Sequence, residues 1–510
     1  MSSPFRNEWI QAMKDEIESI QSNQVWELVD LPPGQKALKS RWVFHEKRNE
    51  KGEIVRRKAR FVCCGYEQRE HIDHGDTFAP VARLETVRLL LSLAARFRMT
   101  LTQFDVKCAF LSGDIDRQIF VRQPALFEDG TSRVCLLKRS LYGLKQSPKL
   151  FNEKIKSVLR DLGLAQNKAE NSLYMKLDKS DLTLLVLYTD DGLIASTRAE
   201  CGQQILLGLS QKLEITTGPP SLYLGAHLTI LPDHSIRLSQ QQYALDLLEK
   251  FNMSESRPVA MPADTGLYGE LAQATRDENE PQVRYRELVG SLAWLANYTR
   301  PDICFIVSCL SRYLDKATKT HWTLAIRVLR YLRSTYNMSL IFPAGDSQLD
   351  SRLELDVFCD SDYAQDSETR RSVSGLIVKL SGAIISWRSS LQKSVSLSTC
   401  ESELVSICEA VKTSQWLRHV LEQADFQVTV TVHADNTAAI RLVKGPELHA
   451  KSKHISIRTF YVRECYEANQ FTIDYVPSAE QLADICTKPL AKGTFQRLRE
   501  LIGLQRLTAN

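Results

Sequence analysis

Two places in the chain put aspartates beside apolar strands. Asp105 lies within the apolar run FDVKCAFL, and Asp190-Asp191 follows the strand-like TLLVLY, with Gly192 suited to a tight turn. Carboxylates that converge from two such strands can hold two magnesium ions, which activate a 3′-hydroxyl and stabilise a leaving pyrophosphate. An Asp-Asp-Gly alone is more typical of a simple turn, so its combination with Asp105 is what favours phosphoryl transfer. An ionised Asp105 inside an apolar strand also needs a compensating partner.

A second acidic set lies towards the C-terminus. Its members are Asp360 and Asp362 in VFCDSDYA, Glu403 on an amphipathic helix, Asp435 at the end of VTVTVHADN, and Asp484 opening a helix after YVP. Four carboxylates on separate elements suit two-metal hydrolysis of a phosphodiester, with one ion on the attacking water and one on the leaving oxygen. For any single member, a solvated surface acid is the alternative.

The sequence pattern predicts the elements that position these acids. A helix is expected over residues 5–22, followed by a hairpin of WVFHEK and IVRRKARFVCCGY. An apolar helix at 85–97 leads into the strand LTQFDVKCAFL. Residues 258–349 are helical in pattern, and beyond a linker at 344–351 strands and helices follow in α/β order.

The segment 36–60 is strongly basic. It holds ten Lys/Arg against three Glu, a larger positive surplus than the +4 of the whole chain. Trp42 and Phe44 are interleaved with these charges. The pattern favours a phosphate-rich partner, because neutralised phosphates release counterions and aromatic rings stack on bases. A solvated hairpin with charged edges is the alternative.

Composition limits the class of protein. The 510 residues predict two to four domains, and 43% hydrophobic with 25% charged residues is typical of a globular protein. The 12 cysteines include no Cys-x-x-Cys pair, which argues against zinc sites and disulfides. No apolar run is long enough for a membrane span, and we expect a cytosolic or nuclear protein.

The order of motifs resembles a known family. KARFVCCGYEQREHIDHGDTFAPVARLETVR, FDVKCAFLSGDIDRQIFVRQP, SLYGLKQSPKLF and YTDDGLIAS are similar to the reverse transcriptase of copia-type long-terminal-repeat retrotransposons, over residues 6–340. The resemblance implies that Asp105, Asp190 and Asp191 are catalytic metal ligands. Thr189 departs from the family's usual Val before the doublet, keeping the β-branched shape and adding a hydroxyl.

The same resemblance implies further contacts. Phe110 corresponds to the bulky residue that crowds the sugar 2′ position and selects deoxynucleotides, with a core aromatic as the alternative. The nucleotide-binding residues that it implies are Lys58, Arg60, Phe110, Tyr142, Gly143 and Lys145. Tyr223, Leu224 and Gly225 resemble the primer grip.

The C-terminal motifs resemble the ribonuclease H domain of the same elements. CDSDYAQDSETRRSVSGLIV, STCESELVSI, HADNTAAI and YVPSAEQLADICTKPL carry this resemblance over residues 355–490. It implies that Asp360, Glu403, Asp435 and Asp484 are catalytic metal ligands, with Asp362 and Glu401 as close neighbours. The catalytic histidine of retroviral enzymes has no clear counterpart, and structural roles are favoured for His433 and His454.

These resemblances predict an α+β protein: a right-hand polymerase with fingers, palm and thumb, followed by an α/β ribonuclease H-like domain. The expected boundaries are a helical arm at 1–34, fingers and palm at 35–257, a thumb or connection at 258–350 and ribonuclease H at 351–510. The implied cofactor is Mg²⁺ or Mn²⁺. The implied partners are an RNA template, a DNA primer, the RNA-DNA hybrid, deoxynucleoside triphosphates and a second copy of the chain, in a cytoplasmic virus-like particle or the nucleus.

A second hypothesis is a retrotransposon remnant that binds nucleic acid through the basic hairpin without useful catalysis. It rests on the lack of a zinc knuckle and of an integrase-type zinc pattern, which such polyproteins normally carry. A partial copy would explain the same absence.

Overall fold

The computed structural model describes residues 5–48, 54–178, 181–274, 282–345, 351–445 and 456–506. The chain divides into two compact units. One comprises Met1–Ala82, Thr102–Asn167 and Asn171–Pro219, and the other comprises Arg83–Leu101, Lys168–Glu170 and Pro220–Asn510. The boundaries expected at 34, 257 and 350 do not coincide with this division, because residues 258–350 and 351–510 share one unit. As functional boundaries they stay predictions.

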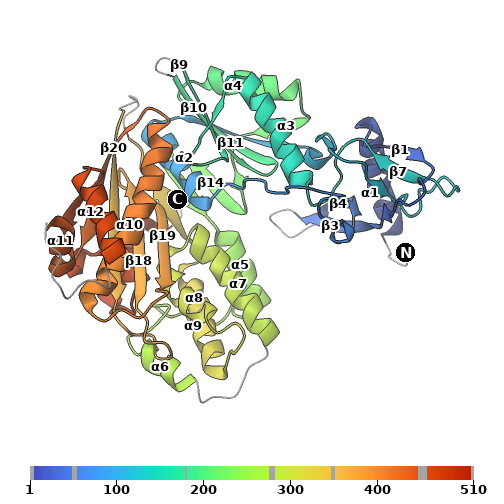
Figure 1. Ribbon diagram of the computed structural model, residues 1–510. Helices are drawn as coiled ribbons and strands as arrows, with labels where there is room; N and C mark the ends of the chain where they lie inside the picture. Colours follow the sequence, from blue (N-terminus) through green and yellow to red (C-terminus); the bar gives the residue numbers. More distant parts are fainter. Residues whose placement is uncertain are drawn as a thin grey trace. The chain divides into compact units, whose positions relative to one another are not determined.

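The first unit contains a six-stranded sheet in the order β12-β5-β11-β10-β9-β8. Its strands are β5 (Thr100–Val106), β8 (Ala165–Gln166), β9 (Leu173–Asp178), β10 (Asp181–Tyr188), β11 (Asp191–Ser196) and β12 (Ile215–Gly218). The helices α3 (Ser147–Asp161) and α4 (Ala199–Ser210) cover one face of the sheet (Figure 1). Phe151 and Ile155 of α3 and Leu209 of α4 share a buried core with Leu185 and Leu187 of β10. This core anchors the strands that carry the first acidic set.

The N-terminal part of the same unit holds the basic hairpin. The predicted helix and hairpin are confirmed as α1 (Arg6–Ser22), β3 (Ser40–Arg48) and β4 (Ile54–Cys63), with the hairpin turn outside the described residues. α1 packs along β4. A four-stranded sheet of β1 (Trp26–Val29), β7 (Val134–Leu137), β6 (Phe120–Val121) and β2 (Ala37–Leu38) completes this part.

One predicted strand is shorter than expected. LTQFDVKCAFL was expected to be extended throughout, but β5 ends at Val106 and Ala109–Leu111 form a 3₁₀ turn, η2. Cys108 adopts a left-handed φ of 52° between them. The short apolar run CAFL at its end misled the prediction, because an apolar run without alternation fits a buried turn as well as a buried strand.

The second unit contains a five-stranded antiparallel sheet with a helical layer. The sheet is β13 (Leu222–Tyr223), β14 (Ala226–Ile230), β15 (Ile236–Ser239), β16 (Met338–Phe342) and β22 (Leu504–Arg506). The helical region predicted at 258–349 forms α6 (Leu267–Ala274), α7 (Gln282–Tyr298), α8 (Cys304–Ser311) and α9 (Lys319–Thr335). The helix α5 (Gln241–Lys250) precedes this region. The apolar helix expected at 85–97 is α2 (Leu84–Arg96), and it packs against β15, β16 and β19 (Ala383–Leu391) of this unit.

The last part of the second unit is a mixed sheet in the order β19-β18-β17-β20-β21. Its strands are β17 (Arg352–Asp362), β18 (Val373–Leu380), β19 (Ala383–Leu391), β20 (Gln427–Ala434) and β21 (Thr472–Tyr475). α10 (Thr399–Glu422) packs on β17, β18 and β20 (Figure 1). α11 (Thr437–Lys444), α12 (Ser456–Glu467) and α13 (Lys492–Leu501) follow. Because β17 and β20 are parallel neighbours, their carboxyl ends meet at one edge of the sheet.

None of the helices in the described ranges combines the length and the apolar content that crossing a membrane requires.

Candidate active sites

The first acidic set is assembled by β5 and the β10–β11 hairpin. Tyr188 pairs with Asp191 across the hairpin, which leaves Thr189 and Asp190 as its turn. Thr189 has a left-handed φ of 58°, an uncommon conformation for a β-branched residue. The N–H of Val106 donates to the carbonyl oxygen of Asp190 at 3.0 Å, which holds the end of β5 against the turn.

Asp105 is exposed, contrary to the expectation of a buried and compensated carboxylate. Its neighbours Phe104 and Val106 are buried, so the alternation of the strand turns Asp105 to the opposite face. The carboxylate therefore keeps its solvation, and it lines a cavity of about 670 Å³ together with Asp190, Lys58, Arg60 and others. Asp191 is half-buried and is not among the residues that line this cavity.

The charges in this cavity act on one another. Burial raises the pKa of Asp190, and the nearby carboxylate of Asp105 raises it further. Arg60 and Lys58 oppose this shift. A site that brings carboxylates and cations together in this way can bind hard metal ions and the phosphates they accompany.

Four acidic side chains in the cavity were missed by sequence reasoning. Glu214 lines it, and so do Asp15, Glu16 and Glu18 of α1, beside the basic strand β4. Glu16 is buried and accepts a hydrogen bond from the N–H of Phe61 at 3.3 Å. For the acids of α1, the signal in the sequence was their close spacing in the stretch DEIE, on a helix with few apolar residues.

The residues proposed to bind nucleotide divide into two groups. The guanidinium of Arg60 lies 5.3 Å from the ring centre of Tyr142, and the ring of Phe110 packs edge-on against Tyr142 at 5.6 Å. Lys145 forms the second group, because it does not line the cavity that contains Arg60 and Tyr142. Its Nζ is 3.3 Å from the Gln68 carbonyl oxygen and 3.4 Å from Nε2 of His74.

The expected primer-grip residues belong to the second unit. Leu224 and Gly225, with φ of 49° and 77°, form the two-residue turn between β13 and β14. Such positive angles are typical of a tight hairpin. Tyr223, the residue before the turn, is fully buried.

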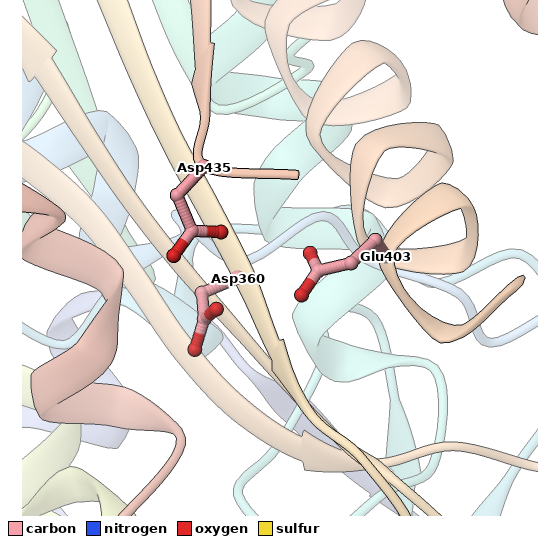
Figure 2. A group of neighbouring side chains, drawn as sticks. All are labelled: Asp360, Glu403 and Asp435. Atoms are coloured by element: carbon pink, nitrogen blue, oxygen red, sulfur yellow. The ribbon is translucent and has the colours of Figure 1, made fainter. Parts of the chain in front are cut away.

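The second acidic set converges at the edge where β17 and β20 end. Figure 2 shows Asp360, Glu403 and Asp435 turned towards one another from β17, α10 and the end of β20. One ligand atom of each lies within 4.8 Å of the others. Among the described residues this is the one group of three or more potential metal ligands, and Asp105, Asp190 and Asp191 do not form a group this close.

The chemistry of this cluster fits a divalent cation. Burial raises the pKa of Glu403 to about 9, and repulsion from Asp360 and Asp435 contributes. Oε1 of Glu403 accepts from the Ser361 N–H at 3.3 Å, whereas Oε2 is buried without a hydrogen-bond partner. Buried carboxylate oxygens without a donor are costly in the protein alone and are natural ligands for a hard ion.

Asp484, the fourth acid, lies beside the cluster. It is in η6 (Leu482–Cys486), a 3₁₀ turn rather than the start of the predicted helix. Its Oδ1 is 2.9 Å from Nζ of Lys488, and Nζ is also 3.5 Å from Oδ2 of Asp360. The hydroxyl of Thr487 donates to the same Asp360 oxygen at 2.5 Å. Asp360 is therefore shared between the cluster and this segment.

The remaining acids named from the sequence have other contacts. Asp362 accepts a hydrogen bond from the Tyr268 hydroxyl, and Glu401 accepts one from the Leu397 N–H at 2.6 Å.

Structural roles were favoured for two histidines, His433 and His454. Nε2 of His433 is 2.9 Å from Oδ1 of Asp356, and its ring stacks on Phe358 at 4.4 Å, which fits the structural role that was favoured. His454 lies outside the described residues.

Fold and sites together describe a mixed α/β protein with carboxylates gathered at strand ends in each of two units. Residues 23–265 match the family model for reverse transcriptase, an RNA-dependent DNA polymerase. The chain is 35% identical over 99% of its length to the retrovirus-related Pol polyprotein from transposon TNT 1-94 of Nicotiana tabacum. It is 30% identical over 60% of its length to a putative transposon Ty5-1 protein of Saccharomyces cerevisiae, covering 99% of that protein.

The chain belongs to the reverse transcriptase family of copia-type retrotransposon Pol polyproteins, as the motifs indicated. It spans 38% of the length of the tobacco polyprotein and 34% of the related RE2 polyprotein of Arabidopsis thaliana, to which it is 33% identical. Among solved structures, ribonuclease H1 from Halobacterium salinarum aligns with 27% of this chain and 94% of its own, at 15% identity and a TM-score of 0.20.

Proposed function

We propose that this chain is an RNA-directed DNA polymerase joined to a ribonuclease H, which copies retrotransposon RNA into DNA and degrades the RNA of the hybrid. The observation that carries the proposal is the cavity that Asp105 and Asp190 share with Lys58 and Arg60, in a chain of this family. Phosphoryl transfer needs metal-binding carboxylates and positive charge around the phosphates, and this cavity has both.

The polymerase half follows the right-hand plan, with fingers and palm at 35–257 and a thumb at 258–350. Asp105, Asp190 and Asp191 would hold Mg²⁺ or Mn²⁺, and bound ions activate the primer 3′-hydroxyl and neutralise the leaving pyrophosphate. Lys58 and Arg60 bind the triphosphate, and Phe110 excludes a ribose 2′-hydroxyl. Tyr142, Gly143 and Lys145 support the nucleotide and template, while Tyr223, Leu224 and Gly225 hold the primer.

In the ribonuclease half, Asp360, Glu403, Asp435 and Asp484 would hold divalent ions, which would supply an activated water for hydrolysis of the RNA strand and stabilise the leaving oxygen. The buried, unpartnered oxygen of Glu403 supports this assignment. The partners in this proposal are the RNA template, the DNA primer, their hybrid and deoxynucleoside triphosphates, with a homodimer as the assembly. The proposed location is a cytoplasmic virus-like particle or the nucleus.

The polymerase assignment is tested by primer extension on an RNA template with Mg²⁺. We expect Asp190→Asn to lower the extension rate by at least about 100-fold, the typical cost of removing one electrostatic group from a transition-state site. Asp161→Asn is the matched control, because this aspartate is exposed on α3. Hybrid binding by folded wild-type protein without extension would reject the proposal in favour of the nucleic-acid-binding remnant.

The ribonuclease assignment is tested with a hybrid that carries labelled RNA. We expect Glu403→Gln to lower cleavage by at least about 100-fold while primer extension stays unchanged, since its carboxylate belongs only to the C-terminal cluster. Glu422→Gln makes the same substitution at the exposed end of α10 and should cleave normally. Equal cleavage by Glu403→Gln and wild type would contradict the assignment.

A further inference from the structure

A lysine stands at one side of the C-terminal acidic cluster. Nζ of Lys488 lies 2.9 Å from Asp484 and 3.5 Å from Asp360. Its side chain is 32% exposed, whereas those of Asp360 and Asp484 are 3% and 7% exposed. The ammonium group therefore neutralises two buried carboxylates and keeps an open route to solvent.

The local backbone fixes this position. The N–H of Lys488 donates to the carbonyl oxygen of Asp484 at 3.3 Å, so a single turn puts both side chains on the same side. Thr487 anchors the turn, because its hydroxyl donates to Oδ2 of Asp360. Withdrawal of Lys488 would leave the two carboxylates in place.

The other side of the cluster has no such cation. Within the described residues, Lys488 lies within ion-pair distance of Asp360 and Asp484 but not of Glu403 or Asp435, and Oε2 of Glu403 has no hydrogen-bond donor. Asp435 accepts a hydrogen bond from the hydroxyl of Ser478 at 2.8 Å, and Lys488 lowers its pKa only at longer range. Asp360 thus lies between two unequal cation positions, one open and one already filled by an ammonium group.

We propose that Lys488 is a built-in cation at the position between Asp360 and Asp484, so that a divalent ion binds there only after the ammonium group has withdrawn. The position formed by Asp360, Glu403 and Asp435 accepts an ion directly. A lysine suits this task because its compact charge sits on a flexible stem and can leave without disturbing the backbone. The inference rests on the proposed metal-binding role of the C-terminal acids.

The test is a titration of the protein with Mn²⁺ in the absence of nucleic acid. The free ion is measured by its electron paramagnetic resonance signal. The parent is the full chain with Asp105, Asp190 and Asp191 changed to Asn, so that only the C-terminal ions are counted. We expect one tight and one weak ion, and we expect Lys488→Met to tighten the weak ion about tenfold or more, because one adjacent positive charge is removed. Lys492→Met, at an exposed position four residues further on, should leave both affinities unchanged.

Further variants keep the inference falsifiable. Lys488→Gln replaces Lys488→Met if the latter does not fold, and Asp484→Asn should abolish the weak ion in both backgrounds. Unchanged affinities in a folded Lys488→Met protein, or two ions of equal affinity in the parent, would overturn the inference.

Hybrid cleavage by the wild type separates this inference from the proposed function. If the wild type cleaves the hybrid but Lys488→Met binds Mn²⁺ with the same affinities as the parent, only the inference about Lys488 is rejected. If Lys488→Met tightens the weak ion as expected but the wild type does not cleave, the inference is supported and the ribonuclease function is rejected.

Discussion

At the scale of single residues, the cavity beside Asp105 and Asp190 is lined by both acidic and basic side chains. Lys58 and Arg60 of β4 meet the acids of α1 as well as the aspartates of the sheet. Glu16 is the most buried of the α1 acids, and burial raises its pKa although the Phe61 N–H, Lys58 and Arg60 favour the charged form. The N-terminal helix therefore adds acidic side chains to the cavity that holds Lys58 and Arg60.

The raised pKa of Glu16 predicts a pH-dependent stability. Its contribution is fully present below the ordinary value of 4.5 and is lost as the pH rises through the folded-state pKa. We expect Glu16→Gln, which stays neutral and can still accept from Phe61, to melt at a higher temperature than wild type at pH 8, with no difference near pH 4. The measurement is thermal unfolding across this range. Glu18→Gln, exposed on the same helix, should follow wild type, and a less stable Glu16→Gln at pH 8 would refute the argument.

At the scale of elements, the end of β4 is held against the segment that starts at Tyr142. The N–H of Cys63 donates to the carbonyl oxygen of Tyr142 at 2.8 Å. Gly143 has a φ of 91°, and a methyl group added there would overlap the Cys63 carbonyl oxygen and the Val62 side chain. This close approach lets Tyr142 lie beside Arg60, so Gly143 serves the site by packing.

A comparison of Gly34 with Gly143 distinguishes the cost of a left-handed backbone from the cost of steric overlap. Gly34 also has a positive φ, 80°, but an added Cβ would meet nothing within 4 Å. We expect Gly34→Ala to lose about 1 kcal/mol of stability from the left-handed backbone alone. Gly143→Ala should lose at least about 2 kcal/mol more, because the overlap forces β4 and the segment apart. Urea unfolding measures both, and equal losses would show that the close approach is not rigid.

At the scale of the whole molecule, the chain crosses between its two compact units more than once. α2 lies in sequence between two stretches of the first unit but packs within the second. Its Arg88 is fully buried and donates to the carbonyl oxygens of Ile385 at 2.8 Å and of Asn297 at 2.9 Å. The guanidinium also lies 4.0 Å from the ring centre of Trp387. A single side chain thus joins α2, α7 and β19.

This connection predicts that Arg88→Leu destabilises the second unit as a whole. The buried carbonyl oxygens lose their donor, and each such loss costs about 1–3 kcal/mol. We expect faster amide hydrogen exchange throughout α7 and β19, measured by mass spectrometry on the full chain. Arg96→Leu, half-buried on the same helix, is the control and should change stability by less than about 1 kcal/mol. Protection lost only within α2 would contradict the prediction.

The sequence by itself determined the family, the main elements and the positions of the acids. Apolar strands and helices have periodic patterns that local sequence carries. Asp190 and Asp435 stand out because each follows such a strand, and Asp360 stands out because it lies near the end of one. The helix at 5–22, the basic hairpin and the strand before Asp190 were predicted for this reason. The motifs then identified the family that the comparisons confirm.

Only the tertiary structure decided which side chains meet. Asp105 is exposed in a cavity, Glu16 shares this cavity with Lys58, and Lys488 reaches Asp360. Each of these placements depends on contacts between residues that are far apart in the chain. The membership of α2 in the second unit is equally non-local. Local patterns cannot contain this information, because such contacts arise only when separate segments fold against one another and the gain in burial exceeds the entropy of closing the loops between them.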